Sequence, residues 1–265
     1  MAFSLTWLPL VLKQAGLKVA EVQGWETRGR TDVGRIFGVV CHHTVGSKNG
    51  NMPSLWNLRD GDANLIGPKA QLGLARDGTF YVIAAGRANH AGRGQFVFTE
   101  NGTQTRIVNG NSNLIGIEGE NTGLNTDMPW PAVQLDAFQR GVAAILKHIG
   151  RGPESCIGHK EWAPNRKIDP LFDMNQFRSA VRRIMDGTAP DPVLIPIIDN
   201  AGRPTIRRGM TGELTKQIQR KLNISPDGSF GPATEAAVRE FQRNHNLVPD
   251  GIVGPKTWAE LDQIA

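Results

Sequence analysis

The chain has 265 residues, of which 39% are hydrophobic and 21% are charged, and its formal net charge is +5. This length allows one sizeable core with a small second domain, or two comparable domains. The apolar runs are too short and too often broken by proline to cross a bilayer, so we expect no membrane insertion. The positive charge favours an anionic partner, such as nucleic acid, an acidic lipid surface or an acidic cell-wall polymer, without choosing among them.

The N-terminal segment predicts a packed amphipathic helix. Its apolar residues follow a helical spacing: Leu5, Leu8, Val11 and Leu12. Thr6 is a suitable N-cap, and Gly16 ends the run. The segment does not resemble a secretion signal, because its first basic residue, Lys13, follows the apolar part and no small-residue cleavage site comes after it. We therefore expect the protein to be made in a cytoplasm without such a signal.

Four apolar stretches predict β-strands, and two periodic stretches predict helices. The strands are expected within residues 36–44, 79–85, 113–120 and 155–162. One helix is expected between Pro131 and Gly150. Another begins after Asp173, which forms a candidate capping box with Gln176. Strands that alternate with helices indicate an α/β fold, with a central mixed sheet flanked by helices.

A proline-rich segment divides the chain. Residues 187–204 contain several prolines and show no helical period. This composition is typical of a linker. We therefore expect a larger domain over residues 1–186 and a smaller domain over residues 205–265.

The smaller domain contains an internal repeat. The sequence "DGSFGPAT" at residues 227–234 recurs as "DGIVGPKT" at residues 250–257. In each copy Asp-Gly forms a turn and Gly-Pro opens a helix, while residues 211–224 supply a third helix. The prediction is a small C-terminal three-helix bundle. Residues 207–261 resemble the peptidoglycan-binding type 1 domain, which implies binding to the bacterial cell wall.

Two histidines and a carboxylate form a candidate set of metal ligands. His42 and His43 end the first predicted strand, His159 ends the fourth, and Asp169 follows in a loop held by prolines. Hydrolytic zinc sites use three such ligands and leave a fourth position to water. Adjacent strand residues point to opposite faces, so only one of the paired histidines can face the site. Cys41 shares its strand face with His43.

Five motifs follow one another within residues 34–184: "VVCHHT", "RDGTFY", "NHAG", "NLIGIEGEN" and "GHKEWAPNRKIDP". Together they resemble the type 2 zinc N-acetylmuramoyl-L-alanine amidases, a family that includes peptidoglycan recognition proteins and phage lysozymes of amidase specificity. The resemblance implies a Zn2+ cofactor held by His42, His159 and Asp169. It makes His43 a packed residue or a support for the ligands. It also makes residues 1–186 a zinc amidase catalytic domain.

Glu118 and Lys167 are candidate catalytic residues. Glu118 is an acid on an otherwise apolar strand, where it is either functional or a strand-end carboxylate in water. The resemblance places the catalytic glutamate there, with Glu120 on the same strand face as the second candidate, and makes Lys167 the residue that stabilises the oxyanion. Some members use a tyrosine in the strand before "RDG", which this sequence lacks. Asn89 and His90, in "GRANHAG", are expected either to line the substrate groove or to stabilise a turn.

These features predict a two-module cell-wall hydrolase. We expect it to cleave the amide between N-acetylmuramic acid and L-alanine in peptidoglycan, to be a monomer, and to bind no nucleic acid, because no basic run or nucleic-acid motif occurs. The combination suggests a phage or prophage endolysin that stays in the host cytoplasm until a holin releases it to the wall. Two alternatives stay open: a peptidoglycan recognition protein that does not cleave, and a zinc cell-wall peptidase, whose different ligand pattern is not found here.

Overall fold

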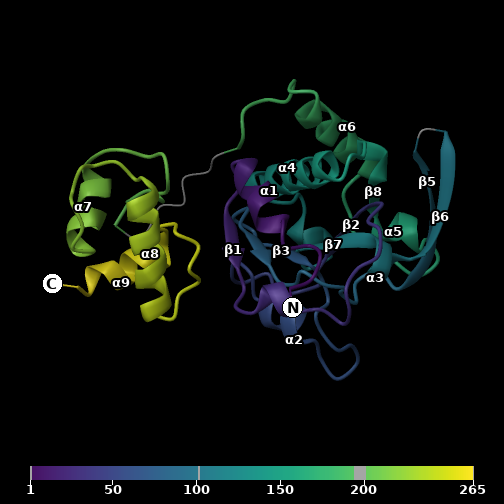
Figure 1. The fold of residues 1–265 in the computed structure, drawn as a ribbon, viewed down its shortest axis with the longest axis horizontal. Helices are drawn as coiled ribbons and strands as arrows, with labels where there is room; N and C mark the ends of the chain where they lie inside the picture. The colour runs from purple at the N-terminus through teal and green to yellow at the C-terminus, as the bar shows by residue number, and fades with distance from the viewer. Residues whose placement is uncertain (1, 101, 194–200, 265) are drawn as a thin grey trace. The chain divides into compact units, whose positions relative to one another are not determined.

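A computed structural model describes three stretches of the chain: residues 2–100, 102–193 and 201–264. The chain divides into two compact units, Met1–Val193 and Leu194–Ala265 (Figure 1). Among the described residues, no helix has both the length and the apolar character needed to cross a bilayer.

The expected linker, residues 187–204, falls partly outside the described residues, which omit 194–200. Its first part is attached to the larger unit by hydrogen bonds, two of which reach residues distant in the sequence. The Arg140 guanidinium donates to the Pro190 carbonyl over 2.7 Å, and the Val193 N–H donates to the Asp136 carboxylate over 3.2 Å. The larger unit therefore continues past the predicted boundary at residue 186.

The larger unit is built on a six-stranded mixed sheet. In spatial order its strands are β1 Val19–Glu21, β4 Phe80–Val82, β3 Leu72–Leu74, β7 Leu114–Gly119, β2 Gly38–His43 and β8 Cys156–Gly158. Neighbouring strands run parallel except β3 and β4, which are antiparallel. This confirms the predicted mixed α/β sheet. Strands β1 and β3 have three residues each, which is too short to leave a period in the sequence.

Strands β2 and β7 form the buried centre of this sheet. Alternate residues face two apolar clusters, with Val39 and Ile115 in one, and Val40 and Leu114 in the other. A parallel strand covered on both faces requires a continuous apolar run, and the first predicted strand has this pattern. The parallel register places His42 directly beside Glu118 on the neighbouring strand.

Three helices cover one face of the sheet: α1 Leu8–Gln14, α4 Ala132–His148 and α6 Met174–Met185. The Asp173 side chain caps α6 by accepting hydrogen bonds from the N–H groups of Asn175 and Gln176. Helix α1 differs from the expectation, because Trp7 holds its N-cap position and no side chain caps it. Pro9 in the first turn supplies the helical backbone angle there instead.

The other face carries a hairpin and short helices. The hairpin consists of β5 Arg93–Glu100 and β6 Thr103–Asn109, and projects beside the sheet in Figure 1. The short helices of the unit are α2 Leu55–Asp60, α3 Gly110–Asn113 and α5 His159–Trp162. Phe98 and Ile107 of the hairpin pack with Trp162 of α5 in the second apolar cluster. The hairpin was not among the predicted elements, because most of β6 is exposed and lacks a clear apolar alternation.

The smaller unit contains three described helices, as predicted: α7 Glu213–Lys221, α8 Pro232–Asn244 and α9 Pro255–Asp262. Its core is apolar and includes Ile218, Phe230, Val238, Val253, Trp258 and Leu261. Gly231 and Gly254 precede the prolines that open α8 and α9. The repeated Gly-Pro therefore starts a helix in both copies, as the sequence indicates.

A buried glutamine explains the rest of the repeat. The Gln219 amide oxygen accepts from the Gly228 N–H over 2.8 Å, and its nitrogen donates to Asp227 Oδ1 and Thr234 Oγ1 over 2.7 and 3.0 Å. Gln242 has the equivalent partners in the second copy: Gly251, Asp250 and Thr257. The Asp, Gly and Thr of each copy are thus the binding partners of one side chain on the preceding helix.

Candidate metal centre

The candidate ligands meet at the carboxyl end of the parallel strands. His42 lies near the end of β2, beside Glu118 on β7, and His159 follows directly after β8. Because the carboxyl ends of parallel strands share one edge of a sheet, side chains distant in sequence converge there. Asp169 reaches the same place from a loop. Its own backbone carbonyl accepts a hydrogen bond from the Lys160 N–H over 2.7 Å.

Three ligand atoms form a tight triangle. His42 Nδ1 lies 2.9 Å from His159 Nδ1 and 3.2 Å from Asp169 Oδ2, and the last two atoms are 3.1 Å apart. All three residues are buried. Ligand atoms about 2.0–2.1 Å from a tetrahedral zinc ion lie about 3.3 Å from one another. The three distances in the triangle are slightly shorter than this value. Two histidine nitrogens and one carboxylate oxygen are ligands that zinc binds, so the residues fit a zinc ion.

The electrostatics of the triangle suit a cation. Burial lowers the pKa of His42 to about 4, so its imidazole is neutral at physiological pH. Burial alone would raise the pKa of Asp169, but the neighbouring His159 and His42 rings outweigh it and hold this pKa well below its usual value. A neutral imidazole and an ionised carboxylate are the forms that bind metals.

His43 lies away from the triangle. As the neighbour of His42 in β2, it points to the opposite side of the strand. Its ring is close to Gly123, where a Cβ atom would come within 2.7 Å of His43 Nε2. Its Nδ1 atom is buried without a hydrogen-bond partner among the described residues. The structure therefore brings His42, and not His43, to His159 and Asp169.

Glu118 borders the triangle. Its Oε1 atom lies 3.9 Å from His42 Nδ1, and its Oε2 atom is buried without a hydrogen-bond partner in the described part of the chain. Burial raises the pKa of Glu118 well above its usual value, and the negative charge of Asp169 adds to this. The positive charge of Lys167 acts in the opposite direction, so the ammonium group lies close enough to influence the same carboxylate.

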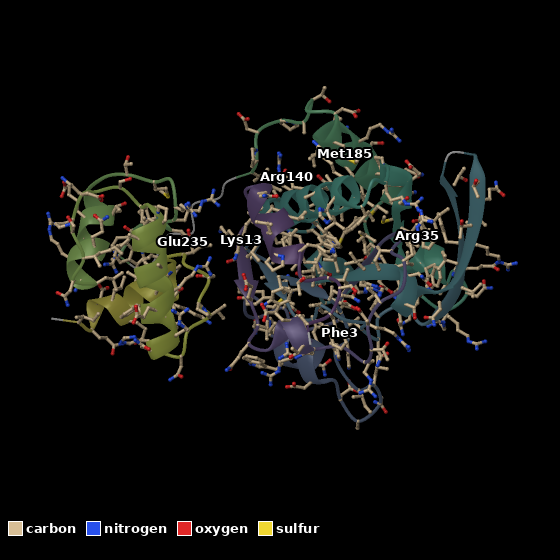
Figure 2. All side chains as sticks on the ribbon, viewed as in Figure 1. Phe3, Lys13, Arg35, Arg140, Met185 and Glu235 are labelled. Atoms are coloured by element: carbon tan, nitrogen blue, oxygen red, sulfur yellow. The ribbon has the colours of Figure 1, made fainter. Side chains whose placement is uncertain are left out.

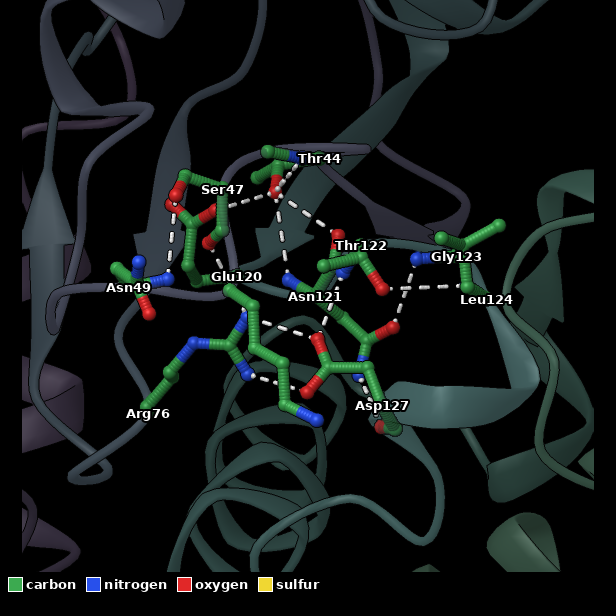
Figure 3. A network of polar contacts seen from close by, with 12 residues as sticks. Thr44, Ser47, Asn49, Arg76, Glu120, Asn121, Thr122, Gly123, Leu124 and Asp127 are labelled. Carbon is green, nitrogen blue, oxygen red and sulfur yellow. Dashed lines mark hydrogen bonds and ion pairs between the residues drawn. The ribbon is translucent and has the colours of Figure 1, made fainter.

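Glu120, the second candidate for the catalytic glutamate, makes its hydrogen bonds away from the triangle. Its carboxylate is fully buried and accepts hydrogen bonds from Thr44 Oγ1, Ser54 Oγ and Ser54 N over 2.8, 2.9 and 3.0 Å. Figure 3 shows Glu120 beside Thr44, with the ion pair of Arg76 and Asp127 in the same region. Glu120 therefore joins the loops that follow β2 and β7, while Glu118 keeps an oxygen without such a bond.

The "NHAG" residues lie behind the triangle. The His90 ring is buried, with Nδ1 3.1 Å from His42 Nε2 and Nε2 3.1 Å from the Leu114 carbonyl. Asn89 donates through its side chain to the Ile66 carbonyl over 3.0 Å. The structure thus places the His90 ring between His42 and the Leu114 carbonyl. The sequence pointed to His90 through the "NHAG" motif. A motif does not show which atoms the ring contacts.

A hollow of about 480 Å³ lies among α1, α4 and α6. Arg140 and Met185, which line it, are labelled in Figure 2. None of the candidate ligands or catalytic residues lines this hollow, and its helices cover the opposite face of the sheet from the cluster that contains Val40 and Leu114. This hollow is therefore separate from the candidate metal centre.

A mixed sheet with two histidines and a carboxylate at its carboxyl edge is an arrangement suited to a metal-dependent hydrolase. A sequence profile of the N-acetylmuramoyl-L-alanine amidases matches residues 32–171. The chain belongs to this family. A second profile, described as a putative peptidoglycan binding domain, matches residues 211–261. No curated protein sequence matches the chain.

Several solved structures are similar to parts of the chain. A peptidoglycan-binding protein from Clostridioides difficile, in complex with glutamine hydroxamate, is 40% identical over 22% of this chain and 39% of its own, with a TM-score of 0.21. The Burkholderia AP3 phage endolysin is 42% identical over 22% of this chain and 25% of its own, with a TM-score of 0.22. The N-acetylmuramyl-L-alanine amidase AmiD from E. coli is 21% identical over 92% and 96% of the two chains, with a TM-score of 0.42. The chain thus spans well under half of the first two proteins, and all three TM-scores are too low to add to the family match.

Proposed function

We propose that the protein is a zinc-dependent peptidoglycan amidase that hydrolyses the bond between N-acetylmuramic acid and L-alanine. The observation that carries this proposal is the buried triangle of His42, His159 and Asp169, with Glu118 beside it. The family match over residues 32–171 supports the choice of substrate. The peptidoglycan-binding profile supports the choice of polymer.

The three ligand atoms and the two charged neighbours have separate roles. A zinc ion held by His42, His159 and Asp169 would supply a Lewis acid, which lowers the pKa of water and polarises a carbonyl group. Glu118 accepts the proton of the attacking water and passes it to the leaving nitrogen. Its Oε2 atom is buried without a hydrogen-bond partner among the described residues, which leaves this oxygen available to exchange a proton. Lys167 stabilises the negative charge that develops on the carbonyl oxygen.

Two alternative functions are less well supported. A recognition protein that binds without cleaving needs neither a complete ligand triangle nor a buried carboxylate next to it, and the chain has both. A zinc cell-wall peptidase would cut within the stem peptide, but the profile that matches the chain is that of the amidases.

Digestion of purified peptidoglycan tests the proposal. Mass spectrometry of the products should show free N-terminal L-alanine and intact glycan strands. A chelator should abolish this release and added zinc should restore it. New reducing ends would indicate a glycosidase, cleavage inside the stem peptide would indicate a peptidase, and full activity in metal-free protein would exclude the zinc mechanism.

We also propose that the smaller unit holds the enzyme on the wall and that the whole chain acts as an endolysin released through a holin. The joint presence of amidase and wall-binding profiles supports both points, because an enzyme that lyses a cell must bind the wall polymer and cut it. If the chain is expressed in a bacterial cytoplasm, lysis should begin only when a holin is co-expressed. Lysis without a holin would contradict this role.

A further inference from the structure

We infer that His90 is a positioning residue whose ring fixes the tautomer of His42, so that His42 Nδ1 presents its lone pair to the metal. The inference rests on the proposed metal site. It concerns a residue outside the triangle, whose ligand atoms come from His42, His159 and Asp169.

The Leu114 carbonyl determines where His90 carries its proton. His90 Nε2 lies 3.1 Å from this oxygen, which can only accept a hydrogen bond, so Nε2 must be protonated. A neutral imidazole has a single N–H, which leaves Nδ1 with a lone pair. The ring is buried, and the hydrogen-bond partners of its two nitrogens among the described residues are the Leu114 carbonyl and the His42 ring, with no carboxylate to balance a charge, so the neutral imidazole is the form that fits here.

The proton on His42 follows from that arrangement. His90 Nδ1 is an acceptor, and it lies 3.1 Å from His42 Nε2. His42 must therefore donate from Nε2, and its Nδ1 atom keeps the lone pair. This Nδ1 is the atom that lies 2.9 Å from His159 Nδ1 and 3.2 Å from Asp169 Oδ2. One backbone carbonyl on β7 thus sets the tautomer of a metal ligand on β2 through the His90 ring.

The surroundings hold the His90 ring in this position. Asn111 Oδ1 accepts hydrogen bonds from three successive backbone N–H groups, those of His90, Ala91 and Gly92, over 3.0, 2.8 and 2.8 Å. The ring packs against Gly116 of β7, where a Cβ atom would come within 2.5 Å of His90 Cγ. Glycine at this position of "IGIE" therefore makes room for the ring two residues before Glu118.

The second histidine ligand lacks such a partner. His159 Nε2 is buried and has no hydrogen-bond partner among the described residues. Of the two histidine ligands, His42 is therefore the one whose tautomer is fixed by a hydrogen bond to a neighbouring ring. We call this arrangement the tautomer lock. Loss of a group that orients a metal-bound histidine typically weakens metal binding about 10- to 100-fold.

Two substitutions of His90 that are similar in size distinguish a role in fixing the His42 tautomer from a role in packing alone. In His90→Asn, the amide oxygen can take the place of Nδ1 and accept from His42, while the bond to Leu114 is lost. In His90→Gln, the amide nitrogen can take the place of Nε2 and donate to Leu114, while the acceptor for His42 is lost. Each variant loses one hydrogen bond, so a structural role alone predicts equal effects.

Zinc affinity, measured by competition with a chromophoric chelator, is the first readout. We expect His90→Gln to bind zinc about 10- to 100-fold more weakly than wild type, and His90→Asn to stay within about threefold. Equal weakening in both variants, or wild-type affinity in His90→Gln, would overturn the inference. Absence of zinc binding in the wild type would instead refute the proposed metal site.

Nitrogen NMR of the metal-free wild-type protein is the second readout, and it requires no variant. The His42 ring should be protonated at Nε2 and not at Nδ1, with a scalar coupling across the hydrogen bond to His90 Nδ1. A proton on His42 Nδ1 would overturn the inference whether or not the protein binds zinc. This measurement therefore separates failure of the lock from failure of the proposed function.

Discussion

Glu118 near the end of β7 and Glu120 just after this strand have different environments. Glu118 has an oxygen that is buried without a hydrogen-bond partner in the described part of the chain, and its pKa is raised mainly by burial. Glu120 is saturated by hydrogen bonds from Thr44 and Ser54. A carboxylate that is free to exchange a proton suits catalysis, whereas one that binds two loops suits structure.

Glu118→Gln should retain zinc but lose activity. The substitution keeps the size of the side chain and removes the base, so we expect a fall on the order of 10²–10⁴ in rate with unchanged metal content. Glu120→Gln is the matched control. It should lower the unfolding temperature, because an amide cannot accept all the bonds that the carboxylate accepts, and retain more activity. Near-normal turnover in Glu118→Gln would show that Glu118 is not the catalytic base.

The paired histidines can be separated in the same way. His42→Ala removes an atom of the triangle and should abolish both zinc binding and activity, as should His159→Ala. His43→Ala should retain most of the zinc, because the ring lies on the other side of β2. Metal content measured beside rate tests this, and zinc loss in His43→Ala together with zinc retention in His42→Ala would reverse the assignment.

Asp127 makes the stability of the protein depend on pH. Burial by itself would raise the pKa of Asp127, but hydrogen bonds from Arg76 and Thr122 outweigh it and lower the pKa. A carboxyl group with a lowered pKa stabilises the fold above its unfolded pKa, about 3.9, and loses this effect as the pH falls through its folded pKa. Asp127→Asn should thus be less stable than wild type above about pH 5, and the difference in midpoint of chemical unfolding should shrink below about pH 4. A difference that does not change with pH would show that the charge plays no part.

At the scale of elements, one side chain per repeat ties each Asp-Gly turn of the smaller unit to the preceding helix. Gln219 on α7 and Gln242 on α8 make equivalent bonds, and both are buried. The turns and the helix starts after them are therefore positioned by tertiary hydrogen bonds as well as by their own turn residues.

Gln219→Ala should destabilise the smaller unit by about 1–3 kcal/mol, because it leaves buried partners unsatisfied. Gln242→Ala should have a similar effect. Gln217→Ala, on the same helix but outside this hydrogen-bond pattern, is the control and should change the stability little. Calorimetry of the full chain follows the transition of this unit, and equal stability of the Gln219 and Gln217 variants would show that the bonds contribute nothing.

At the scale of the whole molecule, the chain consists of two units with separate apolar cores. A chain shortened to residues 1–193 should fold and cleave soluble muropeptides, because the triangle, Glu118 and Lys167 all lie within it. Its binding to whole walls should fall by on the order of 10-fold or more, since the second attachment is lost. Sedimentation with purified walls measures this. Unchanged wall binding, or loss of cleavage in a folded fragment, would contradict the division of roles.

A chain shortened to residues 1–186 provides a comparison for the boundary. It lacks the hydrogen bonds from Arg140 to Pro190 and from Val193 to Asp136. We expect a slightly lower unfolding temperature than for residues 1–193, with the same cleavage of soluble substrate. This difference tests whether the start of the linker belongs to the larger unit.

Local patterns in the sequence were sufficient for the sheet centre, the longer helices and the set of candidate ligands, whereas the short helices α2, α3 and α5 were not predicted, and α5 lies in a segment expected to be a strand. Alternation along a strand places Glu118 on the face opposite to Ile117, and a continuous apolar run marks β2 as buried. These properties depend on neighbours one to four residues away, which a sequence shows directly. The choice of His42 over His43 came from a family resemblance, because alternation alone allows either.

The contacts of His90, Glu120 and Gln219 were decided only by the tertiary structure. His90 meets His42 across 48 positions of the chain, and Glu120 meets Ser54 across 66. The β5–β6 hairpin was missed for a related reason, since its apolar residues are buried only where Phe98 and Ile107 meet the rest of the second cluster. A hydrogen bond requires a partner within about 3 Å, and the order of strands in the sheet determines which distant residues come that close. Residue types and spacing thus indicated the chemistry at the strand ends, while chain packing decided which carboxylate is left without a bond and which histidine is held in a single tautomer.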